Sequence, residues 1–272
     1  MKKVISFVLA AVIALSVFAF VSCDKKAGTD SKTLTVAASS TPHAEILEQC
    51  KDAMAEKGYE LKIEVMSDYI IPNTATESGD VDANYFQHQP YLDSFNAENG
   101  THLVTVQKVH YEPYGVYAGT CASLADLKEG DKVAVDNDPT NEARALLLLE
   151  AAGVIKMKDG ADLTSTKNDI VENPLNLDIV EMEAALLPAQ LDEVAVAVIN
   201  GNYAIEAGLK IADALATEDA QSTAAQTFAN ILVVKEGNEN NEAVKALAEI
   251  ITSDAIRDFI NEKYAGAVVP IF

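Results

Sequence analysis

Short apolar runs alternate with helix-like segments along most of this sequence, and no other feature limits the possible folds as strongly. An apolar run at residues 34–38 is followed by a helix-like stretch at 43–57, which stops at Gly58, and then by period-two alternation at 61–65. This order predicts a β-α-β unit, because the helical segment supplies the crossover that two parallel strands need. The rhythm continues to about Gly208. It predicts an α/β fold with mostly parallel sheets flanked by helices.

The remaining expected elements extend this pattern to the end of the sequence. Further strands are expected at residues 81–86, 103–109, 114–118, 132–135, 179–182, 195–199 and 231–234. Further helices are expected at residues 89–98, 124–128, 141–152, 203–208 and 242–264. Because a long helix follows a late strand, we expect the chain to return to its first domain at its end.

The start of the sequence has the features of an export signal followed by a tether. Two lysines precede an apolar run at residues 4–21, and Cys23 follows this run after one small residue. These features are typical of a lipoprotein signal. We therefore expect residues 1–22 to be a signal peptide, Cys23 to be the lipidated N-terminus and residues 23–32 to be a tether. The alternative is a transmembrane anchor, since 18 apolar residues lie near the lower limit of spanning length, about 18 to 20.

The charge balance argues against one class of partner. The sequence holds 42 acidic and 20 basic residues, a formal charge of −22, whereas binding a nucleic-acid backbone needs clustered lysine and arginine. A hydrophobic content of 49% in patterned segments nevertheless predicts a folded chain. The roughly 250 residues that follow the signal are enough for two domains with cores of their own.

Familiar catalytic and metal-binding motifs are missing from the sequence. It has no Gly-x-Ser-x-Gly elbow, no phosphate loop, no His-Glu-x-x-His and no Gly-x-Gly-x-x-Gly. Cys-x-x-Cys pairs and histidine-rich metal spacing are absent too. We therefore expect a protein that is not an enzyme and has no catalytic residues, cofactor or metal. Once Cys23 carries lipid, Cys50 and Cys121 remain, and the sequence leaves open whether they pair.

The first of three polar loops lies where the expected strand at 81–86 meets a helix. Phe86, His88 and Tyr91 occupy this junction. Ligands of open α/β sheets bind at the carboxyl ends of the strands, which makes these three residues candidates for lining a pocket. Alternatively, Phe86 is an ordinary core residue and His88 is a hydrogen-bonding group inside the fold.

The second loop, residues 137–144, again joins a strand to a helix. Pro139 and Thr140 are typical of a helix start, which places Arg144 near the beginning of the helix. A guanidinium beside helix N-terminal amides suits a carboxylate, because it can bind both oxygens and the helix dipole adds to the attraction. The alternative is a surface arginine paired with one of the many acidic residues.

The third loop ends an apolar strand in Asn200, Gly201 and Asn202. An amide both donates and accepts hydrogen bonds, so these asparagines could bind either end of an amino-acid zwitterion. Turn chemistry explains an Asn-Gly pair equally well.

Five segments, in order through nearly the whole mature chain, carry a resemblance to one family. They are Asp68-Tyr-Ile-Ile-Pro-Asn73, Asp82-Ala-Asn-Tyr-Phe-Gln-His-Gln-Pro-Tyr-Leu92, Val133-Ala-Val-Asp-Asn-Asp-Pro-Thr-Asn-Glu-Ala-Arg144, Glu172-Asn-Pro174 and Ala197-Val-Ile-Asn200. Together they resemble the methionine-binding lipoproteins that serve an ATP-driven importer, within the periplasmic-binding-protein superfamily. The Phe-Gln-His-x-Pro-Tyr and Asn-Asp-Pro-Thr-Asn segments are specific to that family.

The resemblance implies a two-lobed periplasmic-binding-protein fold of the type II-like class. Two crossover strands would join the lobes and let them close over one ligand. Lobe I is expected at residues 33–113 and 232–272, and lobe II at residues 114–231.

The resemblance also implies roles for individual residues. Arg144 is expected to bind the ligand carboxylate. Asn141, Asn200 and Asn230 are expected to orient the ligand's amino and carboxylate groups, with Asn202 as the alternative to Asn200. A pocket for the thioether is expected to be lined by Tyr69, Phe86, His88, Tyr91 and Tyr114. Such a pocket suits methionine, because sulfur packs favourably against aromatic rings.

Capture and delivery is the function that this resemblance implies. L-methionine bound between the lobes would pass to the permease and ATPase of an ABC importer, and the lipid on Cys23 would hold the receptor at the extracytoplasmic side of a bacterial membrane. Other cargoes stay open, namely another amino acid, a methionine-containing dipeptide or a sulfur-containing anion. A surface-exposed adhesin or antigen is the alternative from a different class.

Overall fold

A parallel β-α-β unit opens the first sheet, as the sequence predicts. Strands β1 (Thr33–Ala38) and β2 (Glu60–Val65) pair in parallel, and helix α1 (Glu45–Glu56) connects them. The turn after α1 contains Gly58 at φ +88°, a left-handed conformation that glycine adopts without steric penalty.

The computed structural model describes residues 32–219 and 227–272 of the chain. The expected signal peptide, most of the tether and the lipidated Cys23 lie outside the described residues. Within these two ranges, no helix is both long enough and apolar enough to cross a bilayer.

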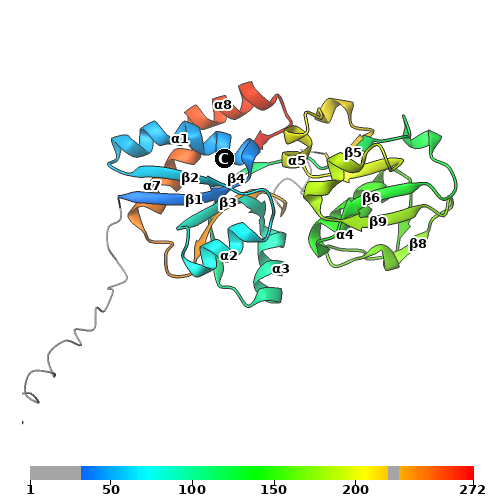
Figure 1. Cartoon of the computed structure of the whole chain (residues 1–272), viewed down its shortest axis with the longest axis horizontal. Helices are drawn as coiled ribbons and strands as arrows, with labels where there is room; N and C mark the ends of the chain where they lie inside the picture. The colour runs from blue at the N-terminus through cyan, green and yellow to red at the C-terminus, as the bar shows by residue number, and fades with distance from the viewer. Residues whose placement is uncertain (1–31, 220–226) are drawn as a thin grey trace, which may run out of the picture. The chain divides into compact units, whose positions relative to one another are not determined.

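Six strands form the first sheet, in the order β13-β4-β12-β3-β1-β2 (Figure 1). Its further members are β3 (Ala83–His88), β4 (Leu103–Tyr111), β12 (Asn230–Lys235) and β13 (Val269–Pro270). Because β12 and β13 come from the end of the chain, the expected return to the first sheet is confirmed. Strand β12 is inserted between β3 and β4, at the middle of the sheet.

Five strands form the second sheet, in the order β11-β5-β10-β6-β9. They are β5 (Gly115–Ala118), β6 (Lys132–Asp136), β9 (Asp178–Met182), β10 (Val196–Ile199) and β11 (Ala216–Thr217). A separate two-stranded sheet pairs β7 (Lys156–Met157) with β8 (Ile170–Glu172). The second sheet is thus built from one continuous stretch of the sequence.

Both large sheets are mixed, which confirms the α/β class and corrects the expectation of mostly parallel pairing. Strand β1 is parallel to β2 and β3, and β6 is parallel to β9 and β10. In contrast, β12 is antiparallel to β3 and β4, and β5 is antiparallel to β10. The reason lies in the path of the chain. Strand β4 leaves for the second sheet and β12 returns from it, so the two run in opposite directions.

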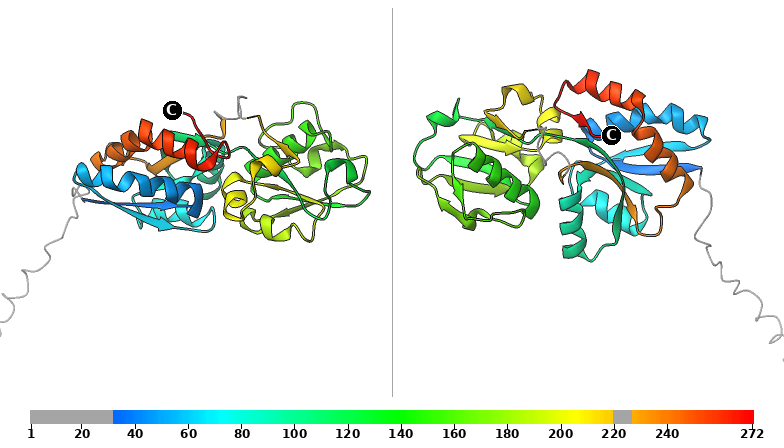
Figure 2. Two further views of the ribbon diagram at one scale, coloured as in Figure 1. Left: turned by 90° about the horizontal axis from the view of Figure 1, so that it is seen from above. Right: turned by 180° about the vertical axis from the view of Figure 1, so that it is seen from behind.

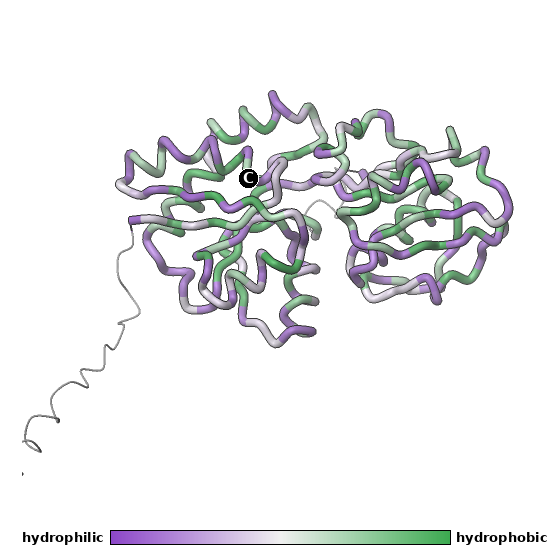
Figure 3. The backbone as a smooth tube through the Cα atoms, viewed as in Figure 1, coloured by the Kyte–Doolittle hydropathy of each residue, from purple (hydrophilic) through white to green (hydrophobic). Residues whose placement is uncertain are grey.

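Helices cover both faces of the first sheet, with α1, α7 and α8 on one side and α2 and α3 on the other (Figure 1 and Figure 2). The helices after α1 are α2 (Ile71–Ser78), α3 (Gln89–Asn99), α4 (Pro139–Ala151), α5 (Gly201–Glu206), α7 (Glu242–Ile251) and α8 (Asp254–Tyr264). Short helical turns are η1 (Ser40–Ala44), η2 (Leu124–Asp126), η3 (Lys167–Asp169), η4 (Ala184–Gln190) and η5 (Ile211–Asp213). Apolar residues concentrate along the strands, and polar residues gather in the loops and outer helical turns (Figure 3).

The expected long helix at 242–264 is in fact two helices, α7 and α8. Thr252 and Ser253 separate them, and Ser253 has an extended backbone at φ −78°, ψ 161°. Short polar side chains offer the backbone alternative hydrogen bonds, as Thr252 does by donating to the carbonyl of Ala248 at 2.9 Å. An apolar periodicity that continues through such a pair hides the break.

Each large sheet has its own hydrophobic core. The core of the first sheet contains Cys50, and that of the second contains Cys121. Both thiols are free and buried, so the pairing that the sequence left open does not occur. Burial raises the pKa of Cys50 to about 12, which keeps it a protonated, unreactive thiol at neutral pH.

Two connections join the sheets, one between β4 and β5 and the other between β11 and β12. The expected boundary at residue 113 falls inside the first connection, whereas the expected boundary at residue 231 falls just inside β12. The assignment of residues to lobes stays a prediction. Both connections carry buried acidic side chains, and these bear directly on the site.

Candidate functional site

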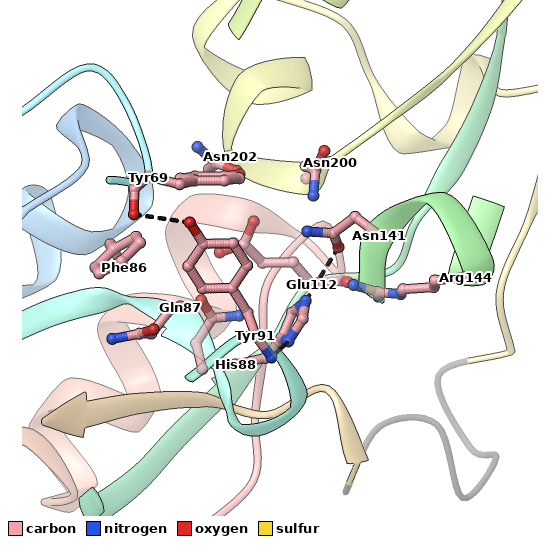
Figure 4. Close-up of a pocket in the computed structure, with 12 residues that line it drawn as sticks. Tyr69, Phe86, Gln87, His88, Tyr91, Glu112, Asn141, Arg144, Asn200 and Asn202 are labelled. Atoms are coloured by element: carbon pink, nitrogen blue, oxygen red, sulfur yellow. Dashed lines mark hydrogen bonds between the residues drawn. The ribbon is translucent and has the colours of Figure 1, made fainter. Parts of the chain in front are cut away.

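Side chains from both sheets surround a pocket with about 350 Å³ of space between them (Figure 4). The lining residues are Tyr69, Phe86, Gln87, His88, Tyr91, Glu112, Asn141, Arg144, Asn200, Gly201, Asn202 and Asn230. Nine of these twelve belong to the ten ligand-binding residues predicted from the sequence. The pocket therefore brings together segments that lie far apart along the chain.

Strand ends and helix starts position most of these side chains. His88 ends β3 and caps α3, where its Nδ1 accepts a hydrogen bond from the backbone N–H of Tyr91 at 3.2 Å. The carboxylate of Asp138 caps α4 and accepts from the N–H groups of Thr140 and Asn141. This cap starts α4 at Pro139, two residues earlier than expected, and presents Arg144 to the pocket.

An aromatic end of the pocket is formed by Tyr69, Phe86 and Tyr91. The ring centroids of Tyr69 and Phe86 are 5.7 Å apart, and those of Phe86 and Tyr91 are 6.1 Å apart. Tyr91 donates its hydroxyl to the carbonyl of Tyr69 at 3.0 Å, which fixes two of the rings. Phe86 is thus both packed and part of the lining, so the pocket and core interpretations of this residue hold together.

Arg144 marks the other, polar end of the pocket. Its side chain is 6% exposed, so it is not the surface arginine of the alternative interpretation. Nε and Nη2 donate to the two carboxylate oxygens of Glu218 at 2.7 and 2.5 Å, and Nη2 also donates to the carbonyl of Glu112 at 3.0 Å. The guanidinium carbon lies 4.7 Å from the ring centroid of Tyr114 and 4.1 Å from that of Phe228.

The ion pair between Arg144 and Glu218 stays charged despite its burial. Burial alone would raise the pKa of Glu218, but Arg144 outweighs this effect and holds the pKa below its usual value. Burial alone would likewise lower the pKa of Arg144, and Glu218 instead raises it. The hydrogen bonds of Arg144 to Glu112 and Glu218 come from Nε and Nη2. We therefore expect Nη1 to be the nitrogen that binds an anion.

The four pocket asparagines share one arrangement, in which each side-chain oxygen faces a protein hydrogen-bond partner. The bonds, with their heavy-atom distances, are Tyr69 Oη to Asn202 Oδ1 (2.6 Å), His43 Nε2 to Asn230 Oδ1 (2.8 Å), His88 Nε2 to Asn141 Oδ1 (3.0 Å) and Tyr114 Oη to Asn200 Oδ1 (3.4 Å). These bonds orient the amides. The NH₂ group of Asn141 also donates to Asp138 Oδ2 at 2.6 Å. The remaining NH₂ hydrogens of the four amides are the ends that face a ligand, which requires acceptor atoms on the ligand.

Asn202 has a buried amide nitrogen without a partner. Its residue is 3% exposed, and its Nδ2 makes no hydrogen bond to any described residue. An unpaired buried donor is costly in a folded protein, and a ligand oxygen would satisfy it. Between the two alternatives Asn200 and Asn202, the orphaned nitrogen favours Asn202.

His88 has a neutral imidazole in this pocket. Burial, together with the nearby charge of Arg144, lowers its pKa to about 4. Its Nδ1 accepts from Tyr91 while its Nε2 donates to Asn141, so both ring nitrogens are used by the protein. We conclude that His88 is the hydrogen-bonding group of the alternative interpretation, placed in the pocket wall.

Tyr114 is the predicted site residue that does not line the pocket. It is fully buried in the core of the second sheet, with its ring against the guanidinium of Arg144. Tyr114 lies in the first connection, close to the site. Its ring packs against the guanidinium of Arg144, and its hydroxyl donates to Asn200 Oδ1 at 3.4 Å.

Glu112 is the important pocket residue that the sequence analysis missed, together with Gln87 and Gly201. Glu112 is 6% exposed, and its Oε1 accepts from His110 Nε2 at 2.7 Å and lies 3.5 Å from His43 Nε2. Burial raises the pKa of this carboxyl, partly offset by His43 and Arg144. A signal was present, since an acidic residue closely follows the strand expected at 103–109.

His43, His110 and Glu112 also form a group with potential metal-ligand atoms within 4.8 Å of one another. Burial lowers the pKa of His43 to about 4 and that of His110 to about 3, so both imidazoles are neutral. Each Nε2 already bonds a protein partner, Asn230 for His43 and Glu112 for His110. The three side chains belong to a hydrogen-bond network that extends to Tyr85 through His110 Nδ1, and among the described residues His43 Nδ1 has no partner in it.

Known proteins match this chain over most of its length. Residues 34–272 match the family model described as NlpA lipoprotein. The chain belongs to the NlpA lipoprotein family. Within this family, the methionine-binding lipoprotein MetQ of Bacillus subtilis is 41% identical over 266 residues, which cover 94% of this chain and 96% of that protein.

Solved structures of NlpA-family relatives confirm the fold. A lipoprotein from Ruminococcus gnavus is 56% identical with a TM-score of 0.87, covering 89% of this chain and 100% of that chain. A nutrient-binding protein from Burkholderia cenocepacia bound to methionine is 41% identical with a TM-score of 0.83, covering 88% and 100%. The matches also include an ABC transporter periplasmic substrate-binding protein from Coxiella burnetii. This chain therefore has the fold of these NlpA-family structures.

Proposed function

We propose that this protein captures methionine between its two lobes and delivers it to an ABC importer. One observation carries the proposal, namely a pocket with a guanidinium and amide donors at one end and three aromatic rings at the other (Figure 4). A Burkholderia cenocepacia relative at 41% identity is bound to methionine, and a Bacillus subtilis relative is named a methionine-binding lipoprotein.

The polar end suits the carboxylate of an amino acid. Nη1 of Arg144 would donate to one carboxylate oxygen, and the NH₂ groups of Asn202 and Asn230 would complete its hydrogen bonds. Glu218 acts as a positioning residue in this arrangement, since it holds the guanidinium plane through Nε and Nη2.

The aromatic end suits a thioether. A polarisable sulfur packs favourably near ring edges at about 5 Å, and the rings of Tyr69, Phe86 and Tyr91 surround this end. An unbranched side chain can extend between the rings, whereas a branched one would meet them earlier. The pocket therefore favours methionine over leucine.

Delivery would follow from closure and anchoring. The lobe assignment, residues 33–113 with 232–272 and residues 114–231, places the pocket between two bodies that bend at the two connections. Methionine would stabilise the closed form by its stronger binding to that form. A lipid on Cys23 would keep the receptor beside the permease and ATPase, with several acyl chains providing a stable anchor.

A ligand screen tests the cargo. Protein stripped of copurified ligand is heated with each of the twenty amino acids and with methionyl dipeptides. At about 100 times the dissociation constant, binding adds roughly 2.7 kcal/mol of stability and raises the melting temperature. A shift with methionine supports the proposal, and a shift with only a dipeptide or another amino acid would overturn it.

The variant Phe86→Ala tests the aromatic end. Removing the ring should weaken methionine binding by about 1–2 kcal/mol, because the thioether loses a packing partner, and should weaken alanine binding less. Isothermal titration below the melting temperature measures both ligands. Equal losses for the two would show that Phe86 serves only the core.

A further inference from the structure

The ammonium group of an amino-acid ligand needs acceptors, and one acceptor position on each pocket asparagine is already in use. The Oδ1 atoms of Asn202 and Asn230 face Tyr69 and His43. The Oδ1 atoms of Asn141 and Asn200 face His88 and Tyr114 in the same way. The sequence predicts that these amides orient both ends of the ligand, and their NH₂ groups suit the carboxylate end.

Glu112 is the one carboxylate among the described residues that line the pocket. Its Oε1 accepts from His110 Nε2 at 2.7 Å, and its carboxylate also accepts the backbone N–H of Asn202. A carboxylate has about four acceptor positions on its two oxygens. These two bonds leave acceptor capacity in a side chain that faces the pocket beside Asn141 (Figure 4).

Among the described residues, no cation donates a hydrogen bond to the carboxylate of Glu112. The imidazole that donates to it, His110, is buried and neutral, as is His43. Arg144 acts on this carboxylate through its charge, but it donates to the backbone carbonyl of Glu112 and to the carboxylate of Glu218. A buried carboxylate without a hydrogen-bonded cation is costly, so an ammonium group in the pocket would gain a partner.

Gly201 provides the room that brings this carboxylate to the pocket. A Cβ atom at residue 201 would lie 2.6 Å from Cβ and 2.7 Å from Oε2 of Glu112, closer than side chains approach. Only glycine at this position lets the carboxylate reach the start of α5. The missing side chain at residue 201 is therefore what allows the Glu112 carboxylate to pack against the start of α5.

We propose that Glu112 is the counter-ion of the ligand's α-ammonium group and gives ligands with a free amino group their higher affinity. The proposal rests on the proposed amino-acid cargo and deepens it. The bond from Arg144 Nη2 to the carbonyl of Glu112, at 3.0 Å, fixes the guanidinium close to residue 112. An amino-acid zwitterion carries its ammonium and carboxylate groups on the same carbon atom, so neighbouring opposite charges in the pocket wall match it. N-acylated and deaminated ligands bind more weakly.

Two ligands and two variants test this assignment. The ligands are L-methionine and 4-(methylthio)butanoate, which is methionine without its amino group. Glu112→Gln removes the charge at nearly constant shape. Glu142→Gln is the matched control, because Glu142 is a similarly buried glutamate at 5% exposure on α4 and does not line the pocket. Isothermal titration gives the four dissociation constants, together with those of the unaltered protein.

We expect Glu112→Gln to weaken the binding of methionine and not that of 4-(methylthio)butanoate. Glu112→Gln weakens methionine binding by about 30-fold or more, because the ammonium loses a buried charged partner, and changes 4-(methylthio)butanoate binding by less than about threefold. Glu142→Gln leaves both constants unchanged. Equal losses for both ligands, or no loss for either, overturn the assignment of Glu112.

Two further outcomes are distinguishable. If the unaltered protein does not bind methionine at all, the proposed function fails and the assignment fails with it. If Glu112→Gln does not fold by circular dichroism, Glu112→Asp replaces it, since this variant keeps the charge and withdraws it by one methylene group. A loss confined to methionine again supports the assignment, and a loss shared by both ligands overturns it.

Discussion

The two connections between the sheets each carry a glutamate that is largely shielded from solvent, and the two glutamates differ in what neutralises them. Glu218, in the second connection, holds Arg144 with both oxygens and keeps a lowered pKa. Glu112, in the first, faces neutral histidines and has a raised pKa. One charge is satisfied by the fold and the other is left to be satisfied by a ligand. Burial of an acidic group therefore does not by itself reveal its role, since the role depends on its partner.

The variant Arg144→Ala should break this comparison most severely. Methionine affinity should fall at least 30-fold, about 2 kcal/mol, because the carboxylate loses its charged donor. The free energy of unfolding should fall by about 3 kcal/mol, because Glu218 is left buried without a cation. Titration and denaturant unfolding measure the two effects. The double variant Arg144→Ala with Glu218→Gln should recover part of the stability and none of the binding, and unchanged stability in the single variant would contradict the pairing.

The variant Gly201→Ala sharpens the comparison by moving Glu112 away from the start of α5. The added Cβ would lie 2.6 Å from Cβ of Glu112, so the backbone at residue 112 or 201 must shift and the carboxylate moves with it. We expect methionine affinity to fall about tenfold, or ~1.4 kcal/mol, with a smaller change for 4-(methylthio)butanoate. Calorimetric titration of both ligands is the measurement. Unaltered methionine affinity would mean that the position of Glu112 does not matter to the ligand.

The smallest expected effect is a dependence of methionine affinity on pH. Burial raises the pKa of Glu112, partly offset by His43 and Arg144, and a bound ammonium favours the ionised carboxylate. Affinity should therefore fall as the pH falls through that raised pKa, by at most about tenfold per pH unit. The facing groups do not titrate in this range, because His43 and His110 have pKa values of about 4 and 3 and Arg144 stays charged.

Titrations between pH 8 and pH 5 measure this dependence, with Glu112→Gln as the control. The unaltered protein should lose affinity toward pH 5 while the variant stays flat. The same slope in both proteins would assign the titration to another group.

The sequence predicted the parts of the fold that depend on local pattern. Apolar runs and helix starts located β1, α1, β3 and α4. The ends of β3, β6 and β10, with the loops that follow them, supplied seven of the twelve lining residues, and Tyr69 and Asn230 bring the number to nine. The family motifs guided this choice, because local chemistry alone left Phe86 and Arg144 open to other interpretations. What failed was pairing direction, since no local pattern records that β12 runs against β3 and β4.

Glu112 was missed for a related reason. Acidic residues are abundant in this chain, 42 of them by composition, and a surface position is the ordinary expectation for each. Its burial depends on His110 from its own strand, His43 from η1 and the missing side chain of Gly201 on α5. Only the assembled tertiary structure brings these three segments together.

The place of β12 has a consequence for the order of assembly. Strands β3 and β4 are joined only through β12, so the first sheet cannot be completed until residues 230–235 are available. All strands of the second sheet lie within residues 115–217 and come earlier in the chain. Non-local strand pairing is slow, and unpaired strand edges invite aggregation. We therefore expect the half of the protein that begins the sequence to finish folding last, with the edges of β3 and β4 unpaired until β12 arrives.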